Sequence, residues 1–283
     1  MQIARLPLPF VKMSGTGNDF ILIDHRRPFI AREAMPEFAR LVCRRRFSVG
    51  ADGLILIENS DQADFKWLFF NGDGSEAEMC GNGARCAARF AYMQGIAPAH
   101  HMLFETLAGI IEASVADVNV SIRMTAPQQV KLDGKLRLDS ETIELHSMDT
   151  GVPHVVIFVD DLELVDVGAL GSRIRHHPDF MPAGTNVNFV QHLADGTLKM
   201  RTYERGVEGE TLACGTGATA TALVAALVGR ASSPVEIITA GGDRLVIIFD
   251  LAADKTAHNV FLKGPAHVIY KGELKAEALI ENS

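Results

Sequence analysis

The sequence has few cysteines and no long apolar run. Only four of its 283 residues are cysteine, and they lack the close spacing of a zinc or redox pair. No apolar run approaches the roughly 20 residues of a membrane helix, and the first residues carry no apolar stretch of signal length. We therefore expect reduced thiols in a cytoplasmic protein, with neither a disulfide scaffold nor a membrane partner.

An excess of basic residues is also lacking. The formal net charge is −8, from 27 Lys and Arg against 35 Asp and Glu, which argues against nucleic acid as a partner. Hydrophobic residues make up 47% and charged residues 22%, as in ordinary globular proteins. A chain of this length can form two domains, each with its own core.

Two glycine-rich cysteine segments indicate an internal repeat. Cys80-Gly-Asn-Gly-Ala and Cys214-Gly-Thr-Gly-Ala lie 134 residues apart, and each runs into an alanine-rich segment. The same offset of 134 residues relates Gly17 to Gly151 and Gly50 to Gly184. We infer two structurally equivalent halves that are joined near residues 115–130.

The patterning predicts many strands and two buried helices. Strands are expected at the β-branched or aromatic runs 7–13, 19–24, 53–58, 65–70, 109–124, 154–159, 185–190, 197–204, 234–239, 244–249, 258–262 and 266–271. Segments 82–94 and 216–229 carry small residues on nearly every face, which predicts buried helices.

The expected fold is therefore α/β, of the α+β type. It has two pseudo-symmetric domains, each a mixed sheet wrapped around a central buried helix, with the active site in the cleft between them. The expected first domain is 1–124, joined by the C-terminal segment 268–283, and the second is 125–267.

Cys80 and Cys214 each precede a Gly-x-Gly that opens a predicted buried helix. Unpaired N–H groups and the helix dipole favour a thiolate there, compared with a free thiol of pKa about 8.5, and can also bind a carboxylate. A single cysteine before a glycine turn is more often a small buried residue, but the duplication favours a function. Cys43 and Cys86 lack this context, and we assign both to packing.

Two cysteines of this kind suit the inversion of an amino-acid α-carbon. One base removes the α-proton and a second group returns a proton to the opposite face. Pseudo-symmetric halves can aim two identical groups at one atom, one starting as thiolate and the other as thiol. His154 and Glu204 are candidate acceptors of a thiol proton, although His154 alone is equally typical of a strand end.

Other polar residues predict recognition of a charged amino acid. Arg205 suits bidentate binding of a carboxylate, while Glu204-Arg205 is also typical of a surface ion pair. Amides in glycine-containing turns can bind ammonium and carboxylate groups, although each is singly more often a turn residue. These amides are Asn18, Asn71, Asn82 and Asn188.

These motifs together resemble the diaminopimelate epimerase family over nearly the whole chain. The resemblance rests on Lys12-Met-Ser-Gly-Thr-Gly-Asn-Asp-Phe20, Asn71-Gly-Asp-Gly-Ser, Cys80-Gly-Asn-Gly-Ala-Arg85-Cys86, Pro153-His154, Thr185-Asn-Val-Asn188-Phe, Tyr203-Glu-Arg-Gly and Cys214-Gly-Thr-Gly. It implies interconversion of LL- and meso-diaminopimelate in lysine and peptidoglycan precursor synthesis, without pyridoxal phosphate, other cofactor or metal. Cys80 and Cys214 would be the acid/base pair, tuned by His154 and Glu204, and a homodimer is expected.

The resemblance also implies a set of substrate contacts. These are Asn18, Asn71, Gly81, Asn82, Asn188, Glu204, Arg205, Gly215 and Thr216. The chain departs from the pattern at Gly53, where many members have glutamine, and at Val152, where many have asparagine. Segment 207–208 also contains an apparent one-residue insertion.

Because of these departures, other functions stay open. A related racemase could act on proline, histidine or another amino acid. Two neighbouring cysteines are also compatible with a thiol redox protein, and helix starts with amides are compatible with a non-enzymatic amino-acid-binding module.

Overall fold

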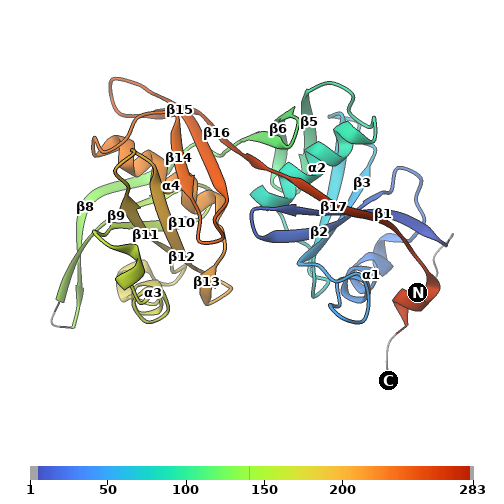
Figure 1. Ribbon diagram of the computed structural model, residues 1–283, viewed down its shortest axis with the longest axis horizontal. Helices are drawn as coiled ribbons and strands as arrows, with labels where there is room; N and C mark the ends of the chain where they lie inside the picture. The colour runs from blue at the N-terminus through green and yellow to red at the C-terminus, as the bar shows by residue number, and fades with distance from the viewer. Residues whose placement is uncertain (1–5, 140, 281–283) are drawn as a thin grey trace. The chain divides into compact units, whose positions relative to one another are not determined.

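The structure, a computed structural model, describes residues 6–139 and 141–280 (Figure 1). The chain divides into two units: unit 1 extends to Ile122 and resumes at Pro265, and unit 2 is Arg123–Gly264. The sequence led us to expect these divisions after residues 124 and 267.

Unit 1 is built on a mixed sheet. Its strands are β1 (Leu8–Gly15), β2 (Asn18–Asp24), β3 (Gly53–Glu58), β4 (Phe65–Asn71), β5 (His101–Thr106), β6 (Gly109–Ala116), β7 (Asn119–Arg123) and β17 (His267–Leu274). They pair in the order β17-β1-β2-β3-β4-β5-β6-β7, with β2–β3 and β4–β5 parallel and the other pairs antiparallel. The last strand of the chain thus completes the sheet of the first unit.

Unit 2 has the same strand order. Its strands are β8 (Gln128–Leu138), β9 (Glu141–Asp149), β10 (Pro153–Phe158), β11 (Asn186–His192), β12 (Leu198–Glu204), β13 (Gly209–Thr211), β14 (Val235–Ile238), β15 (Arg244–Leu251) and β16 (Ala257–Pro265). The order is β8-β9-β10-β11-β12-β14-β15, with β16 beside β15 and β13 beside β12. β10–β11 and β12–β14 are the parallel pairs. In this order β8 takes the place that β17 has in unit 1.

Each unit contains one helix whose sides are almost entirely buried. These helices are α2 (Gly81–Met93) and α4 (Gly215–Leu227), each of 13 residues. α2 packs against β1, β2, β3 and β6, and α4 packs against β9, β10, β11, β14 and β15. Small side chains such as Ala84 and Ala218 are fully buried, which lets strands approach closely on several sides.

The glycines that mark the repeat have a backbone reason to be glycine. Gly17, Gly50, Gly151 and Gly184 have φ of 92°, 74°, 106° and 65°. Only glycine adopts such angles readily, so both units use the same tight connections ahead of equivalent strands.

The sequence patterns did not predict every element. They missed β5, β8, β9 and β13, and they merged β6 with β7, which a turn at Asp117 with φ of 56° separates. They also missed α3 (Val167–Arg175) and the 3-10 turns η1 (Arg32–Ala34), η2 (Leu162–Leu164), η3 (Pro178–Phe180) and η4 (Ala276–Leu279). The helical pattern around Cys43 is confirmed as α1 (Met35–Val42), whose C-cap residue is Cys43. Most residues of β8 are exposed, so this strand lacks the alternating apolar residues that signal a half-buried strand.

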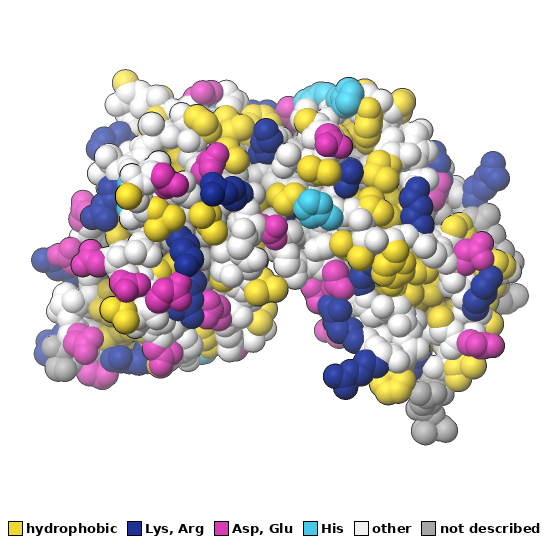
Figure 2. All heavy atoms as spheres, viewed as in Figure 1, with side chains coloured by type: hydrophobic (Ala, Val, Ile, Leu, Met, Phe, Trp, Pro, Cys, Tyr) yellow, Lys and Arg dark blue, Asp and Glu magenta, His cyan; other side chains and the backbone are white. Residues whose placement is uncertain are grey.

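The surface carries charges of both signs. On the face shown in Figure 2, basic and acidic side chains lie interspersed over the part of the molecule that holds β8 to β15. Within residues 6–139 and 141–280, no helix is long and apolar enough to cross a membrane.

Candidate active site

Cys80 is the N-cap residue of α2. Its backbone is extended, with φ of −146° and ψ of 117°, and its sulfur accepts a hydrogen bond from the Gly83 N–H at 3.5 Å. The first N–H groups of a helix have no intrahelical partner, and they favour negative charge at this position. A Cβ on Gly81 would meet its nearest heavy atom, Ile122 Cδ1, at 3.6 Å, so the helix start has an uncrowded backbone.

Two of the predicted amides meet beside Cys80. Asn82 Nδ2 donates to Asn18 Oδ1 at 2.8 Å, and Asn82 Oδ1 accepts from Thr16 Oγ1 and Arg85 Nη2, both at 2.8 Å. A guanidinium only donates, so Arg85 fixes the Asn82 oxygen toward itself and the Asn82 nitrogen toward Asn18. Arg85 is itself fully buried and also reaches the carbonyl of Gly81.

A cluster of charged residues binds the amide nitrogen of Asn18, whose oxygen accepts from Asn82. Asn18 Nδ2 donates to Asp52 Oδ2 at 3.0 Å, and Arg45 pairs with Asp52 at 2.9 Å and with Asp19 at 2.6 Å. Lys12 pairs with Asp19 at 2.8 Å. Burial raises the pKa of Asp19, but hydrogen bonds from Arg45 and Lys12 outweigh it, and the net direction is downward. Asp19 therefore stays ionised within this cluster.

Asn71 and Gly53 lie at the adjoining ends of β4 and β3, where they are register partners. Asn71 is exposed, and its Nδ2 donates to Ser75 Oγ at 3.0 Å. A Cβ on Gly53 would lie 2.6 Å from a ring carbon of Phe69 and 2.8 Å from the carbonyl oxygen of Phe70. The glycine at position 53 therefore matches the local packing, and a larger residue would require Phe69 to move.

Cys214 is the N-cap residue of α4, with φ of −127° and ψ of 110°. Its sulfur lies 3.4 Å from Thr216 Oγ1. The Cys214 side of unit 2 thus repeats the extended cap of Cys80, but here a hydroxyl is the neighbour of the sulfur.

His154 lies on β10 behind Thr216. Its Nε2 is 2.9 Å from Thr216 Oγ1, and its Nδ1 is 3.1 Å from Asn188 Nδ2. Burial lowers the pKa of His154 to about 3, and the positive charge of Arg205 acts in the same direction. The imidazole is therefore neutral at neutral pH, and these contacts connect it to Cys214 through Thr216.

Asn188 is fully buried in unit 2. Besides His154, its Nδ2 donates to the carbonyl of Val155 at 2.9 Å, and its Oδ1 accepts from Thr202 Oγ1 at 2.9 Å. Every polar atom of the amide is therefore engaged inside the unit. The direct substrate contact implied by the family resemblance stays a prediction for Asn188.

Glu204 and Arg205 lie where β12 ends. Burial raises the pKa of Glu204, and a hydrogen bond from Thr211 Oγ1, at 2.7 Å from Glu204 Oε2, opposes this effect. Arg205 donates its backbone N–H to Asn186 Oδ1 at 2.9 Å and its guanidinium to the carbonyl of Ala183 at 3.0 Å. A carboxyl group with a raised pKa is suited to proton transfer closer to neutral pH.

The first turns of α2 and α4 pack against chemically different side chains. A Cβ on Gly83 would meet Ile55 Cδ1 at 3.3 Å and Phe20 at 3.5 Å, whereas a Cβ on Gly217 would lie 2.4 Å from Asn188 Oδ1. Gly83 and Gly217 are equivalent in the repeat. The support is apolar in unit 1 and polar in unit 2.

The sequence patterns did not identify several residues that complete these networks. They are Thr16, Asp52, Arg85, Asn186, Thr202 and Thr211. Arg85 carried a usable signal, since it is a charged residue within a helix that is mostly small or apolar. The hydroxyls and the other polar residues stand in strands or turns, where such residues are ordinary.

The remaining cysteines fit the packing assignment. Burial raises the pKa of the Cys43 and Cys86 thiols to about 12, so both are neutral and unreactive at neutral pH. All four cysteines are thiols. In the described parts of the chain, no group of three or more His, Cys, Asp or Glu side chains is arranged to hold a metal ion.

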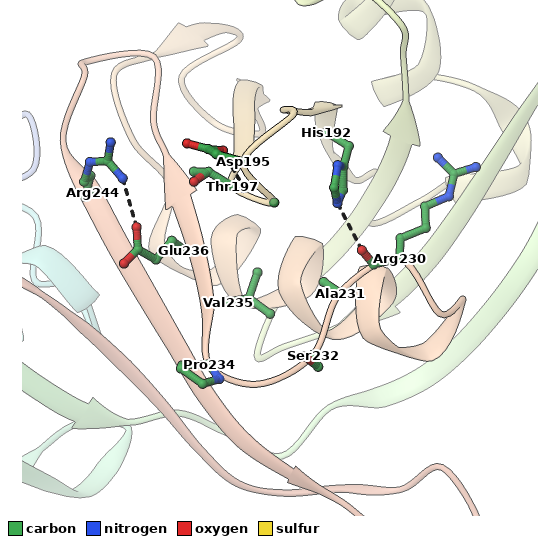
Figure 3. Close-up of a pocket in the computed structure, with 11 residues that line it drawn as sticks. His192, Asp195, Thr197, Arg230, Ala231, Ser232, Pro234, Val235, Glu236 and Arg244 are labelled. Carbon is green, nitrogen blue, oxygen red and sulfur yellow. Dashed lines mark hydrogen bonds and ion pairs between the residues drawn. The ribbon is translucent and has the colours of Figure 1, made fainter.

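A separate polar pocket opens on unit 2 (Figure 3). The described residues that line it are His192, Asp195, Gly196, Thr197, Arg230, Ala231, Ser232, Pro234, Val235, Glu236 and Arg244. In this pocket Arg244 pairs with Glu236 at 2.9 Å, and the His192 ring meets the carbonyl of Arg230 at 3.1 Å. The lining residues are distinct from the predicted site residues of unit 2.

Solved structures define the class of fold. The chain is similar to a phenazine biosynthesis protein of the PhzF family from Bacillus anthracis, with a TM-score of 0.71 and 16% identity over 96% of this chain and 100% of that chain. It is also similar to a probable proline racemase from Agrobacterium radiobacter K84, with a TM-score of 0.68 and 17% identity over 95% and 93%. At such identities the likeness shows the fold alone, and it confirms the predicted two-domain α/β class.

Sequence comparison identifies the family within this class. The family model for diaminopimelate epimerase matches residues 10–130 and 146–269. The diaminopimelate epimerase of Aquifex aeolicus strain VF5 is 47% identical over 283 residues, covering 96% of this chain and 99% of that protein. That of Hydrogenobaculum sp. strain Y04AAS1 is 48% identical over 278 residues, covering 94% and 98%. The chain belongs to the diaminopimelate epimerase family, as its motifs implied.

Proposed function

We propose that this protein is an isomerase that converts LL-diaminopimelate to meso-diaminopimelate, in lysine and peptidoglycan precursor synthesis, without pyridoxal phosphate. One observation carries the proposal. Each unit of a member of this family presents a cysteine, Cys80 or Cys214, as the extended N-cap of a buried helix of 13 residues. That position favours a thiolate and offers backbone N–H groups to a carboxylate.

In the proposed reaction the two cysteines exchange roles. The thiolate takes the α-proton, so that the Cα–H bond breaks and an S–H bond forms, and the electron pair delocalises into the α-carboxyl group. The thiol on the opposite face gives its proton to the α-carbon and becomes the thiolate. The carbon is inverted, and the net proton count is unchanged.

The other residues of the proposed site bind the substrate or adjust the pKa of the two cysteines. Gly81 with Asn82, and Gly215 with Thr216, present helix N–H groups to the α-carboxylate. Asn18, Asn71 and Arg205 offer amides and a guanidinium to the charged ends of the substrate. Glu204, whose pKa burial raises, and His154 adjust the protonation of the cysteines.

The direct test is isotope exchange coupled to inversion. The purified protein is incubated with LL-diaminopimelate in D₂O, with a chelator and without pyridoxal phosphate. We expect meso-diaminopimelate that carries deuterium at the inverted α-carbon, detected by chiral chromatography and mass spectrometry. Absence of both inversion and exchange would reject the proposed activity.

Other substrates distinguish the alternative functions. Parallel reactions with L-proline and L-histidine test the racemase alternative, and inversion of either one without inversion of diaminopimelate would reassign the substrate. Peroxide and a small disulfide test the redox alternative. We expect no enzymatic turnover of either, while reversible oxidation of the cysteines abolishes epimerisation.

We also propose that the protein acts in the cytoplasm as a homodimer. Four cysteines that are all thiols suit a reducing compartment. Light scattering coupled to gel filtration tests the dimer, for which a single species of twice the 30.7 kDa chain mass is expected and a single species at the chain mass is the contrary result.

A further inference from the structure

A continuous series of hydrogen bonds runs through unit 2 to Cys214. It starts at Thr202, passes through the Asn188 amide to the His154 ring, and continues from His154 to Thr216. The last contact, 3.4 Å long, joins Thr216 Oγ1 to Cys214 Sγ. All but the last two residues lie on the strands β10, β11 and β12, which hold them rigidly behind the helix start.

The chemistry of its neighbours fixes the orientation of the Asn188 amide. The carbonyl of Val155 can only accept a hydrogen bond, and it lies 2.9 Å from Asn188 Nδ2. The amide nitrogen must therefore be on that side, which is also the side of His154 Nδ1 at 3.1 Å. The oxygen then faces the Thr202 hydroxyl, which donates to it.

This orientation selects one tautomer of His154. An amide nitrogen only donates, so His154 Nδ1 must accept and carries no hydrogen. The ring is neutral because burial lowers the pKa of His154 to about 3, and Arg205 is the nearby charge that adds to this effect. The single ring hydrogen is therefore on Nε2, which points to Thr216 Oγ1 at 2.9 Å.

The tautomer bears on the remaining bond. Thr216 Oγ1 accepts from His154 Nε2, which leaves the hydrogen of its hydroxyl available to Cys214 Sγ at 3.4 Å. A hydroxyl donor stabilises a thiolate more than a thiol, because charge-assisted hydrogen bonds are the stronger kind. In unit 1 the residue equivalent to Thr216 is Asn82, whose amide nitrogen donates to Asn18 Oδ1, and Cys80 Sγ accepts from the backbone N–H of Gly83 at 3.5 Å instead of from a hydroxyl.

We propose that Asn188 is a positioning residue, which holds His154 in the Nε2–H tautomer so that Thr216 donates to Cys214 and favours Cys214 as the thiolate of the free enzyme. This inference rests on the proposed function only for its catalytic meaning. Its structural content, the tautomer and the unequal reactivity of the two cysteines, is measurable on the protein without substrate.

The first test is the tautomer itself. In the full-length protein labelled with ¹⁵N-histidine, the His154 signals are assigned by their loss in His154→Gln. We expect a protonated Nε2 and an unprotonated Nδ1 at pH 7. In Asn188→Asp, which can no longer donate, we expect Nδ1 to become protonated. A wild-type His154 with its hydrogen on Nδ1 would overturn the proposal.

The second test is the reactivity of the cysteines. Iodoacetamide labelling at pH 7, followed by mass spectrometry, gives separate rates for Cys214 and Cys80. Removing the hydroxyl in Thr216→Val should slow alkylation of Cys214 by about tenfold, because the thiolate loses a charge-assisted hydrogen bond, and leave the Cys80 rate unchanged. An unchanged Cys214 rate would contradict the proposal.

Thr219→Val is the matched control. Thr219 is a buried threonine of the same helix, and its hydroxyl donates to the carbonyl of Gly215 at 3.0 Å. We expect it to leave Cys214 alkylation within twofold of wild type, and an equal loss in both variants would show a general disturbance of α4 instead. If the wild-type protein fails to epimerise diaminopimelate but gives the expected tautomer and rates, the proposed function fails and this inference stands.

Discussion

The side-chain oxygen of Asn188 lies 2.4 Å from the position that a Cβ on Gly217 would occupy. Real Cβ atoms do not approach an oxygen so closely, so the glycine is what lets α4 begin against the Asn188 amide. The Gly-x-Gly of unit 2 therefore has a packing function in addition to its exposed N–H groups.

Gly217→Ala should destabilise the protein. Alanine normally stabilises a helix relative to glycine by roughly 0.5–1 kcal/mol, but here the added methyl must displace Asn188, and overpacking of this kind costs about 1–3 kcal/mol. We expect a lower urea midpoint with an unchanged slope. Gly83→Ala is the matched control, because its Cβ would meet only Ile55 and Phe20 at 3.3–3.5 Å. Equal midpoints for the two variants would refute the argument.

His154 should make stability depend on pH. Its folded pKa of about 3 lies below the ordinary value of 6.5, so the unfolded chain binds the proton first as pH falls. Its stabilising contribution is complete above pH 6.5 and declines toward pH 3, by up to about 1.4 kcal/mol per pH unit. Between pH 7.5 and 5, wild type should lose about 2 kcal/mol more unfolding free energy than His154→Gln. Equal losses of unfolding free energy in wild type and His154→Gln, measured by urea titration at the two pH values, would contradict this prediction.

Replacing either site cysteine should remove inversion. Cys80→Ser and Cys214→Ser each lack one of the two proposed bases, and loss of a positioned proton-transfer group lowers turnover by roughly 10²–10⁴. The measurement is the rate of meso-diaminopimelate formation, with ligand binding followed by calorimetry to show that the site persists. Cys43→Ala is the control, since Cys43 is buried among packing residues. Full turnover in either serine variant would reject the two-base assignment.

The internal repeat was the most informative feature of the sequence. Glycines and cysteines at one offset predicted two equivalent halves, and the small residues of segments 82–94 and 216–229 predicted the two buried helices. The hairpin β8–β9 gave no such signal, since most residues of β8 are exposed.

The side-chain networks of the site were less predictable. His154 was identified as a neighbour of the chemistry, but its link to Cys214 passes through Thr216, a relation that only tertiary structure reveals. Asn188 stood in a strand motif and looked like a ligand residue, whereas its complete burial follows from the packing of α4 on β11. A repeat offset predicts equivalent backbones, whereas the chemistry of each half depends on the side chains around them, such as Ile55 beside Gly83 and Asn188 beside Gly217.

Arg85 should be the most sensitive charged residue of unit 1. Its guanidinium is fully buried and donates to Thr16, Asn82 and the carbonyls of Gly81 and Pro265. Arg85→Met removes these buried hydrogen bonds, and we expect a loss of about 2–4 kcal/mol in unfolding free energy. Arg26→Ala breaks an exposed pair with Asp24 and should cost at most about 1 kcal/mol. Similar urea midpoints for the two variants would show that the buried network contributes little.

Thr211 should shift the acid limb of the pH–rate profile. Its hydroxyl bonds Glu204 Oε2 at 2.7 Å and lowers the pKa of a carboxyl group that burial raises. In Thr211→Val the pKa of Glu204 therefore rises further, and if turnover needs the carboxylate, the acid limb of kcat/KM moves to higher pH. Profiles of epimerisation between pH 5 and 9 measure this shift. Glu204→Gln, which cannot ionise, should remove that limb together with most of the activity. An acid limb that stays in place in Thr211→Val would mean that another group controls it.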